Sequence, residues 1–146
     1  MRITEVKGDI FENDRECYCQ CISADFKMGA GIALQFKEKF KVKEQLVKMY
    51  GDYKKWFRRD GAGAIVTHDP LVMNLVTKMN YYDKPTYDSM DIALKQAADM
   101  CYGLDIFELS MPRIGCGIDG LKWEKVKPLI EKNFADLNML VTVYYL

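Results

Sequence analysis

The sequence predicts a three-layer α/β/α sandwich with a mixed central sheet. Short apolar segments rich in strand-forming residues alternate with longer segments whose apolar residues recur every three or four positions. Two glycine-containing segments each follow a strand-like run and precede a helix-like one. This alternation is typical of a sheet that carries helices on both faces. At 146 residues, without a linker or internal repeat, the chain is expected to form a single domain over residues 1–146.

The first half of the chain contains two strand candidates followed by a helical region. Residues 3–6 form a short candidate strand, and residues 17–23 form a second one that is largely apolar. After the first glycine segment, apolar side chains fall on one helix face as far as Phe40, and the periodicity continues from residue 42 to residue 50. Because Gly51 follows, we expect one helical region that ends there.

The second half alternates between the two kinds of element. Residues 64–67 and 71–77 are strand candidates joined by a turn at residues 68–70. Thr86 is an N-cap candidate for the clearest helix, which ends at Gly103. Pro128 is expected within the first turns of a later helix, with a small kink or a late start there. The remaining elements are a strand at residues 106–111, that helix at about 123–134, and a strand at 140–145.

Composition argues against several classes of protein. The chain holds 21 basic and 21 acidic residues, so it lacks the basic excess typical of nucleic-acid-binding proteins. It contains no apolar stretch long enough for a transmembrane helix, and its first residues lack the apolar run of a signal peptide. We therefore expect an intracellular protein without membrane association, in the cytoplasm or nucleus, or in the host-cell cytoplasm if the source is viral.

One segment is strongly basic, although the chain as a whole has no net charge. Residues 54–59 hold four basic side chains around Trp56 and Phe57. A solvated surface face is the favoured interpretation, and contact with phosphates is the alternative.

Cysteine and histidine usage argues against a metal centre. The five cysteines are expected to be free thiols in a reducing compartment. Cys17, Cys19 and Cys21 alternate as on one face of a strand, about 6.6 Å apart in steps, a poor geometry for a tetrahedral site. We interpret them as small buried side chains. His68 is the single histidine, so a catalytic triad would have to use it. No metal or organic cofactor is expected.

The two glycine segments are candidate phosphate-binding loops. Backbone N–H groups at a helix N-terminus attract phosphate oxygens, and glycine permits close approach. Two such loops suit a diphosphate, although either one alone is more often a simple turn. The chain has no G-x-x-x-x-G-K-[ST] motif, and Leu34 occupies the third position of a dinucleotide fingerprint that begins at Gly29.

Several longer segments are more specific. They are residues 7–11, 21–25, 28–33, 84–87 and 109–119, followed by Trp123 and Glu124. In this order they resemble segments of macrodomains, in the branch that contains terminal ADP-ribose protein glycohydrolase, also described as an O-acetyl-ADP-ribose deacetylase. The resemblance runs from about Arg2 to Leu146, and it is loose at residues 51–69 and 79–83.

The resemblance implies an ADP-ribose site. Asp9 matches the position that holds the adenine amino group, although Asp9 and Glu12 also form a capping-box pattern. Ser23 and Asp25 match positions near the distal ribose, and the chain end matches a segment beside the adenine or is simply part of an edge strand. The implied binding residues are Asp9, Ile10, Ser23, Asp25, Met28, Gly29, Ala30, Gly31, Ile32, Pro112, Ile114, Gly115, Cys116, Gly117, Ile118, Tyr144 and Leu146.

Lys78 and Asp119 match the catalytic pair of that branch. In the implied reaction the lysine amine attacks the anomeric carbon of the distal ribose, displaces a carboxylate and leaves an adduct that water resolves, while the aspartate moves protons. Attack requires the neutral amine, which desolvation in a cleft favours. Without the resemblance, Lys78 would be a solvated strand end and Asp119–Gly120 a common turn dipeptide.

The expected function is removal of mono-ADP-ribose from Glu or Asp side chains of proteins and deacetylation of O-acetyl-ADP-ribose, by a monomer. One alternative is an ADP-ribose reader without turnover, and another is a hydrolase of ADP-ribosylated nucleic acid. Whether Tyr81 or Tyr82 forms a lid stays open at this stage.

Overall fold

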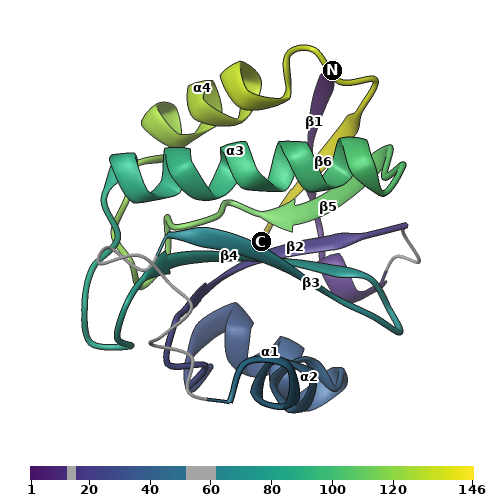
Figure 1. Ribbon diagram of the computed structural model, residues 1–146. Helices are drawn as coiled ribbons and strands as arrows, with labels where there is room; N and C mark the ends of the chain where they lie inside the picture. Colours follow the sequence, from purple (N-terminus) through teal and green to yellow (C-terminus); the bar gives the residue numbers. More distant parts are fainter. Residues whose placement is uncertain (13–15, 52–61) are drawn as a thin grey trace.

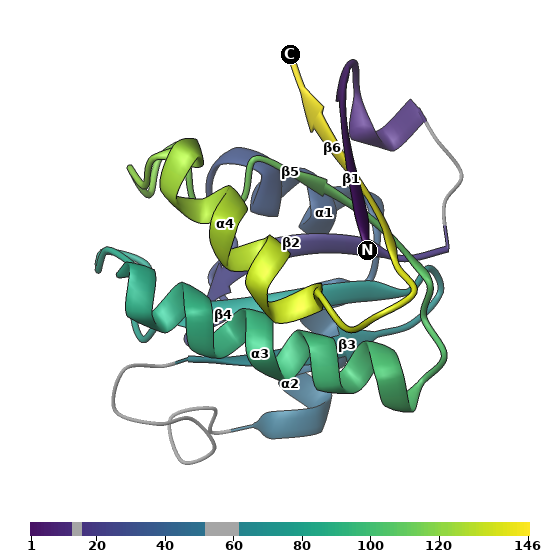
Figure 2. The same cartoon turned by 90° about the horizontal axis from the view of Figure 1, so that it is seen from above.

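The computed structural model describes residues 1–12, 16–51 and 62–146. It is a three-layer arrangement in which α3 and α4 cover one face of a sheet and α1 and α2 cover the other (Figure 1). Seen from above, α3 and α4 run side by side (Figure 2). The basic cluster at residues 54–59 lies outside the described residues.

The described strands form one six-stranded sheet with the order β1-β6-β5-β2-β4-β3. All neighbouring pairs are parallel except β3 and β4, which are antiparallel and are joined by the predicted turn at residues 68–70. The mixed sheet is therefore confirmed. The strands are β1 (Arg2–Lys7), β2 (Tyr18–Ser23), β3 (Gly63–Thr67), β4 (Val72–Lys78), β5 (Glu108–Pro112) and β6 (Leu140–Tyr145).

The first helical region differs from the prediction, because it forms two helices, α1 (Gly31–Lys39) and α2 (Val42–Tyr50). Phe40 leaves the helical conformation, with φ −130° and ψ 157°. Its ring packs on the rings of Tyr18 and Phe36, with centroids 5.5 and 5.9 Å away. The sequence has no helix breaker at this point, so tertiary packing is the physical reason for the break.

The other two helices follow their sequence signals. In α3 (Tyr87–Gly103) the Thr86 hydroxyl accepts a 2.9 Å hydrogen bond from the Ser89 backbone N–H, as expected for an N-cap. The Ser89 hydroxyl accepts one in return from the Thr86 N–H, so the cap is a capping box. In α4 (Trp123–Phe134) the helix starts before Pro128, so the alternative of a late start at this proline is wrong.

The core lies on both faces of the sheet. Along β2 and the residue before it, Cys17 and Cys19 pack toward α3 and α4, whereas Tyr18 and Ile22 pack on the opposite side with α1 and α2. The predicted single face for the alternating cysteines is confirmed, and all five cysteines are free. Among the described residues, no helix is long and apolar enough to cross a membrane.

One edge of the sheet is built to hold a site. Five of the strands are parallel, so the carboxyl ends of β1, β6, β5, β2 and β4 reach the same edge. Within the described chain, β2 and β5 pair only at Tyr18 and Ser110, whereas β2 pairs with β4 along its whole length. The carboxyl halves of β2 and β5 therefore separate, as at the crevices where open α/β sheets bind ligands.

Candidate active site

A cavity of about 930 Å³ occupies this edge of the sheet. Segments that follow β1, β6, β5, β2 and β4 line it in that order across the sheet. Four inter-strand spacings of ~4.8 Å, one of them widened where β2 and β5 separate, make the site at least about 19 Å wide. Its shape therefore suits an elongated ligand whose two ends meet different strands, β1 and β6 at one end and β2 and β4 at the other.

Most predicted site residues line this cavity. Lys78, Asp119 and both predicted glycine loops do, and so does the chain end at Tyr144 and Leu146. Of the predicted residues, all of which are described, Asp25 alone lies outside the lining. Its carboxylate instead accepts hydrogen bonds from the Ser23 hydroxyl at 2.5 Å and from the Tyr81 backbone N–H at 2.7 Å. Both carboxylate oxygens of Asp25 therefore hold neighbouring loops together, and its contact with the distal ribose stays a prediction.

At the β1–β6 end, Asp9 has two structural roles. It lines the cavity, and its carboxylate also accepts a 2.9 Å hydrogen bond from the Phe11 N–H, which begins the short 3-10 helix Ile10–Glu12. The capping alternative is therefore present in part together with the cavity position. Tyr144 is buried, whereas Leu146 is 95% exposed at the chain end.

The first glycine loop reaches α1 through left-handed backbone. Met28 has φ 49° and Gly31 has φ 59°, so the chain turns sharply here before the helix begins. A Cβ at Gly31 would lie 3.2 Å from Ile118 Cδ1, in the second glycine loop. A Cβ at Gly29 would meet no atom within 4 Å and its φ is not positive, so the fold itself does not require glycine at this position.

In the second glycine loop, too, the fold requires one glycine and leaves the other free. Gly115 has φ 73°, and a Cβ there would lie 2.8 Å from Met90 Cε and 2.9 Å from Leu121 Cδ1. Gly117 has neither restriction and lines the cavity. Glycine is therefore structural at Gly115, whereas at Gly117 it leaves open space beside the loop.

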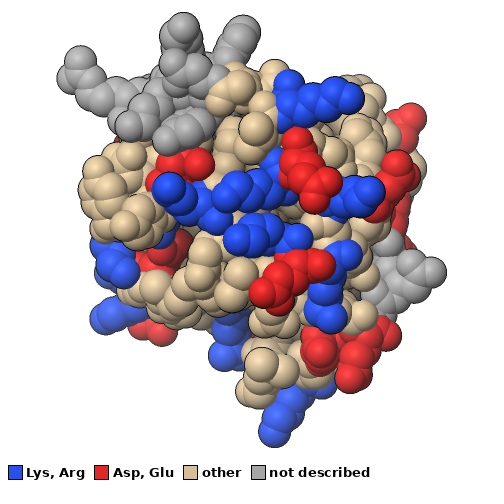
Figure 3. Space-filling model, turned by 90° about the horizontal axis from the view of Figure 1, so that it is seen from below, with Lys and Arg blue, Asp and Glu red and all other residues tan. Residues whose placement is uncertain are grey.

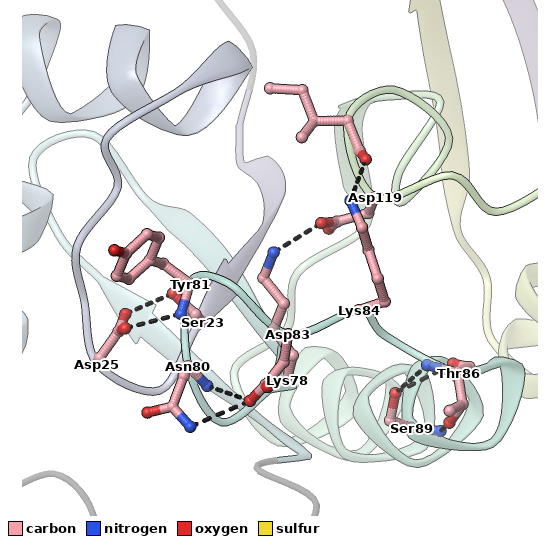
Figure 4. A network of polar contacts seen from close by, with 11 residues as sticks. Ser23, Asp25, Lys78, Asn80, Tyr81, Asp83, Lys84, Thr86, Ser89 and Asp119 are labelled. Carbon is pink, nitrogen blue, oxygen red and sulfur yellow. Dashed lines mark hydrogen bonds and ion pairs between the residues drawn. The ribbon is translucent and has the colours of Figure 1, made fainter.

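Lys78 and Asp119 meet in this cavity (Figure 4), although β2 lies between β4 and β5 in the sheet. Lys78 ends β4, Asp119 lies beyond β5, and the lysine Nζ is 2.7 Å from the aspartate Oδ1. The two side chains are 12% and 17% exposed. The cavity thus contains an amine and a carboxylate in direct hydrogen-bond contact and largely shielded from water, which is the arrangement needed for nucleophilic and acid–base chemistry.

A second lysine fixes the same loop. Lys84 Nζ donates a 2.7 Å hydrogen bond to the Ile118 carbonyl, one residue before Asp119 (Figure 4). The segment that begins at Lys78 therefore holds the second glycine loop at two adjacent residues. This contact was not predicted, because nothing in the sequence links Lys84 with Ile118.

Cysteines do not compete as nucleophiles. Cys21 and Cys116 line the cavity, and burial raises the pKa of both thiols above the ordinary value of 9.0. A thiol with a raised pKa carries little of the thiolate that acts as nucleophile. Among the described residues, no group of His, Cys, Asp and Glu has the arrangement of a metal site. His68 precedes β4 and Lys78 ends it, so the histidine lies at the opposite edge of the sheet.

Sequence reasoning missed part of the lining. Several of the lining residues that were not predicted are direct neighbours of predicted ones, so wider windows around the motifs would have included them. Cys21 and Ile22 are exposed to the cavity because β2 and β5 separate, which requires knowledge of strand pairing. The missed lining residues are Gly8, Cys21, Ile22, Lys27, Ala33, Gln35, Tyr81, Arg113 and Tyr145.

Comparison with known proteins finds relatives that align along nearly the whole of this chain. It is 38% identical over 147 aligned positions to human ADP-ribose glycohydrolase OARD1, covering 99% of this chain and 92% of that protein. It is 27% identical to the DNA ADP-ribosyl glycohydrolase of Mycobacterium tuberculosis, over 98% of this chain and 42% of that longer protein. No family model matches the sequence.

Solved structures agree on the fold. The macrodomain of Thermus aquaticus DarG superposes with a TM-score of 0.85 at 24% identity, over 99% of both chains. Thermosipho africanus DarTG in complex with ADP-ribose superposes with a TM-score of 0.80 at 21% identity, over 97% of this chain and 41% of that one. Together with the likeness to OARD1 along nearly its whole length, these matches show that the chain belongs to the macrodomain family.

Proposed function

We propose that this chain binds ADP-ribose in the cavity and hydrolyses the bond between its distal ribose and an acidic group, releasing ADP-ribose from Glu or Asp side chains and acetate from O-acetyl-ADP-ribose. The observation that supports this most is the 2.7 Å contact between Lys78 Nζ and Asp119 Oδ1 at one end of a cavity with two glycine loops. Relatives named ADP-ribose glycohydrolases and a similar fold in complex with ADP-ribose agree with it. We expect the protein to act inside the cell as a monomer.

The ligand has a natural direction in the cavity. ADP-ribose carries adenine at one end, a diphosphate in the middle and a free ribose at the other end. The β1–β6 end, with Asp9 and Tyr144, takes the adenine, and the two glycine loops surround the diphosphate. Gly29 and Gly117 leave room for phosphate oxygens to approach the backbone. The distal ribose then lies beside Lys78 and Asp119.

The reaction proceeds in two displacements. Asp119 accepts a proton from the Lys78 ammonium, and the neutral amine attacks the anomeric carbon. A C–N bond forms, the C–O bond breaks, and the carboxylate of the substrate leaves with the bonding electron pair and takes up the proton that Asp119 holds. Asp119, again a carboxylate, then accepts one proton from the positively charged nitrogen. Water then attacks the same carbon, the amine departs with the proton held by Asp119, and Asp119 receives the proton of the water. Acid–base catalysis of this kind contributes about 10²- to 10⁴-fold in rate.

Two alternative functions differ from this proposal in turnover or in the acceptor. A reader module would bind ADP-ribose without turnover. A hydrolase of ADP-ribosylated nucleic acid is favoured by the relatives named DNA ADP-ribosyl glycohydrolase, and it would use the same amine and carboxylate on another acceptor.

The test measures release of ADP-ribose from a glutamate-modified protein by wild type, Lys78→Ala and Asp119→Ala. Calorimetric binding of free ADP-ribose serves as the folding control. We expect wild type to turn over and both variants to bind without releasing product. Tight binding without any release by wild type would leave the reader as the better account.

A further inference from the structure

The end of β4, where Lys78 lies, is irregular. Strands β2 and β4 pair residue by residue along most of β2, but the register shifts before Ser23, which pairs with Lys78 and leaves Thr77 as an extra residue. An extra residue in one strand bends that strand and re-aims the side chains beside it. The Ala24 N–H then donates a 2.9 Å hydrogen bond to the Lys78 carbonyl, which continues the pairing by one residue.

Beyond this point the Asp25 carboxylate joins the two segments (Figure 4). Its Oδ2 accepts a 2.7 Å hydrogen bond from the Tyr81 N–H, shortly after Lys78 in the chain. Its Oδ1 accepts hydrogen bonds from the Ser23 hydroxyl at 2.5 Å and from the Lys27 N–H at 3.1 Å. One side chain therefore connects the end of β2 and the start of the first glycine loop with the segment that follows Lys78.

Local turn formation explains only part of these contacts. The hydrogen bond from the Lys27 N–H to Asp25 is an Asx-turn, which aspartate forms in many loops. On the face shown in Figure 3, which carries α1 and α2, acidic side chains lie next to lysines and arginines. Among the described residues, by contrast, no ion pair includes Asp25. Its contact with Tyr81, 56 positions along the chain, therefore needs another explanation.

The segment between β4 and α3 forms a β-turn that Asp25 anchors. The Asp83 N–H donates a 3.0 Å hydrogen bond to the Asn80 carbonyl, and Asp83 Oδ2 accepts from the Asn80 N–H and side-chain amide. Neither Tyr81 nor Tyr82 has a positive φ, as in a type I turn with Tyr81 at its second position. The turn is thus closed by its own residues, and the contact with Asp25 fixes it relative to β2.

The place of the Lys78 amine decides whether it can react. The amine is 2.7 Å from Asp119 Oδ1, and the anomeric carbon has to come within about 3–3.5 Å of it for attack. The Asp119 side of this pair is held by the hydrogen bond from Lys84 to the Ile118 carbonyl. On the Lys78 side, the corresponding hold is the contact of Asp25 with the backbone that follows the lysine.

We propose that Asp25 is a positioning residue for the reaction: by accepting the Tyr81 N–H it fixes the backbone beyond Lys78, so that the amine faces the reacting carbon. This inference rests on the proposed function. It differs from the contact with the distal ribose that the resemblance implies, because Asp25 then acts through the backbone and touches no substrate atom. The cavity lining agrees with it, since Ser23, Lys78 and Tyr81 line the cavity and Asp25 does not.

The first test removes the hydrogen bond without changing Asp25. Tyr81→Pro deletes the N–H that Asp25 accepts, and proline is favoured at the second position of a type I turn. Tyr81→Ala is the matched control, because it removes the same ring and keeps the N–H. We expect kcat on O-acetyl-ADP-ribose to be about 10- to 100-fold lower for Tyr81→Pro than for Tyr81→Ala, with a similar Kd for ADP-ribose in the two variants.

The second test changes the acceptor. Asp25→Asn keeps only one acceptor oxygen, so either the Tyr81 N–H or the groups on Oδ1 lose their partner, and kcat should fall to a similar extent. Calorimetry with ADP-ribose, and with ADP, which lacks the distal ribose, should give affinities close to those of wild type. Glu44→Gln makes the same chemical change at an exposed residue of α2 and should leave kcat and both affinities unchanged. Thermal unfolding verifies that each variant is folded.

Three results would overturn the positioning role. One is an equal kcat for Tyr81→Pro and Tyr81→Ala. Another is a loss of affinity for ADP-ribose but not for ADP in Asp25→Asn at an unchanged kcat, which would assign Asp25 to the distal ribose. The third is a lowered unfolding midpoint of Asp25→Asn at an unchanged kcat, which would leave Asp25 a role in stability alone. Each of these with an active wild type refutes only this inference, whereas a wild type that releases product from no ADP-ribosyl substrate would remove the proposed function and this inference with it.

Discussion

The two ends of the cavity are constructed differently. At the β2–β4 end, side chains hold one another in place: Lys78 contacts Asp119, Lys84 contacts the Ile118 carbonyl, and Asp25 joins Ser23 to the Tyr81 backbone. At the β1–β6 end, the lining includes a capping aspartate, a buried tyrosine and a final residue that is almost fully exposed.

This difference separates two kinds of requirement. A reacting carbon has to be met by correctly placed charges, and small displacements there cost rate. A flat ring that only binds needs a surface and one or two polar groups. Substitutions at the β2–β4 end should therefore change kcat, whereas those in the middle and at the β1–β6 end should change affinity or stability.

The largest effect is expected from Asp119→Asn. The variant keeps the shape of the side chain and a hydrogen-bond acceptor toward Lys78, but it has no proton to exchange. We expect kcat to fall about 10²- to 10⁴-fold while the Kd for ADP-ribose changes little. Single-turnover kinetics together with calorimetry would measure both quantities. A large loss of affinity with an unaffected kcat would show that Asp119 only binds.

The middle of the cavity offers a matched pair in one loop. Gly117→Val should lower ADP-ribose affinity more than about 100-fold at an unchanged unfolding midpoint, because its side chain enters open space beside the loop. Gly115→Ala should instead lower the free energy of unfolding by about 1–3 kcal/mol, because φ is 73° and the new Cβ would lie 2.8 Å from Met90 Cε. Calorimetry and thermal unfolding on both variants separate the effects, and unchanged affinity in folded Gly117→Val would refute the phosphate-loop assignment.

Substitution of Lys84 is a smaller test of the side-chain contacts at the β2–β4 end of the cavity. Lys84→Met removes the hydrogen bond to the Ile118 carbonyl, one residue before Asp119, and keeps the aliphatic chain. A bond of this kind corresponds to roughly a 3- to 10-fold effect, which we expect in kcat more than in KM. Lys84→Arg should recover part of the loss, and an effect confined to KM would place Lys84 in binding instead.

The smallest effect concerns stability at the β1–β6 end. Glu5 of β1 accepts hydrogen bonds from Lys127, Trp123 and Arg113, and the Lys127 contact is the main cause of a pKa held below the ordinary 4.5. Because the folded pKa is lowered, the stabilisation is present above about pH 4.5 and is lost as the pH falls through the folded pKa. Glu5→Gln should therefore cost at most about 1 kcal/mol at neutral pH, and the difference should shrink in acid. Urea unfolding at several pH values measures it, and a difference that grows in acid would contradict the sign.

Much of the fold could be predicted from the sequence, because its signals are local. Strand alternation, the Thr86 cap and the glycines that end helices need only neighbouring residues. The break at Phe40 could not be predicted, because it depends on rings contributed by other elements.

The site divides in the same way. The glycine loops and the positions of Lys78 and Asp119 follow from motifs, through the resemblance to macrodomains. The contact of Lys84 with Ile118, the use of Asp25 inside the loops and the exposure of Cys21 to the cavity depend on how distant segments meet. No local sequence pattern around these residues predicts contacts between such distant segments.

The central claim is that Lys78 becomes covalently attached to the ribose during turnover. The most direct measurement is mass spectrometry of the protein quenched during turnover of a glutamate-modified substrate, with borohydride added to stabilise the adduct. We expect one ADP-ribosyl group on the peptide that contains Lys78, and no adduct in Lys78→Ala, which should still bind ADP-ribose. Full turnover by Lys78→Ala would contradict the account.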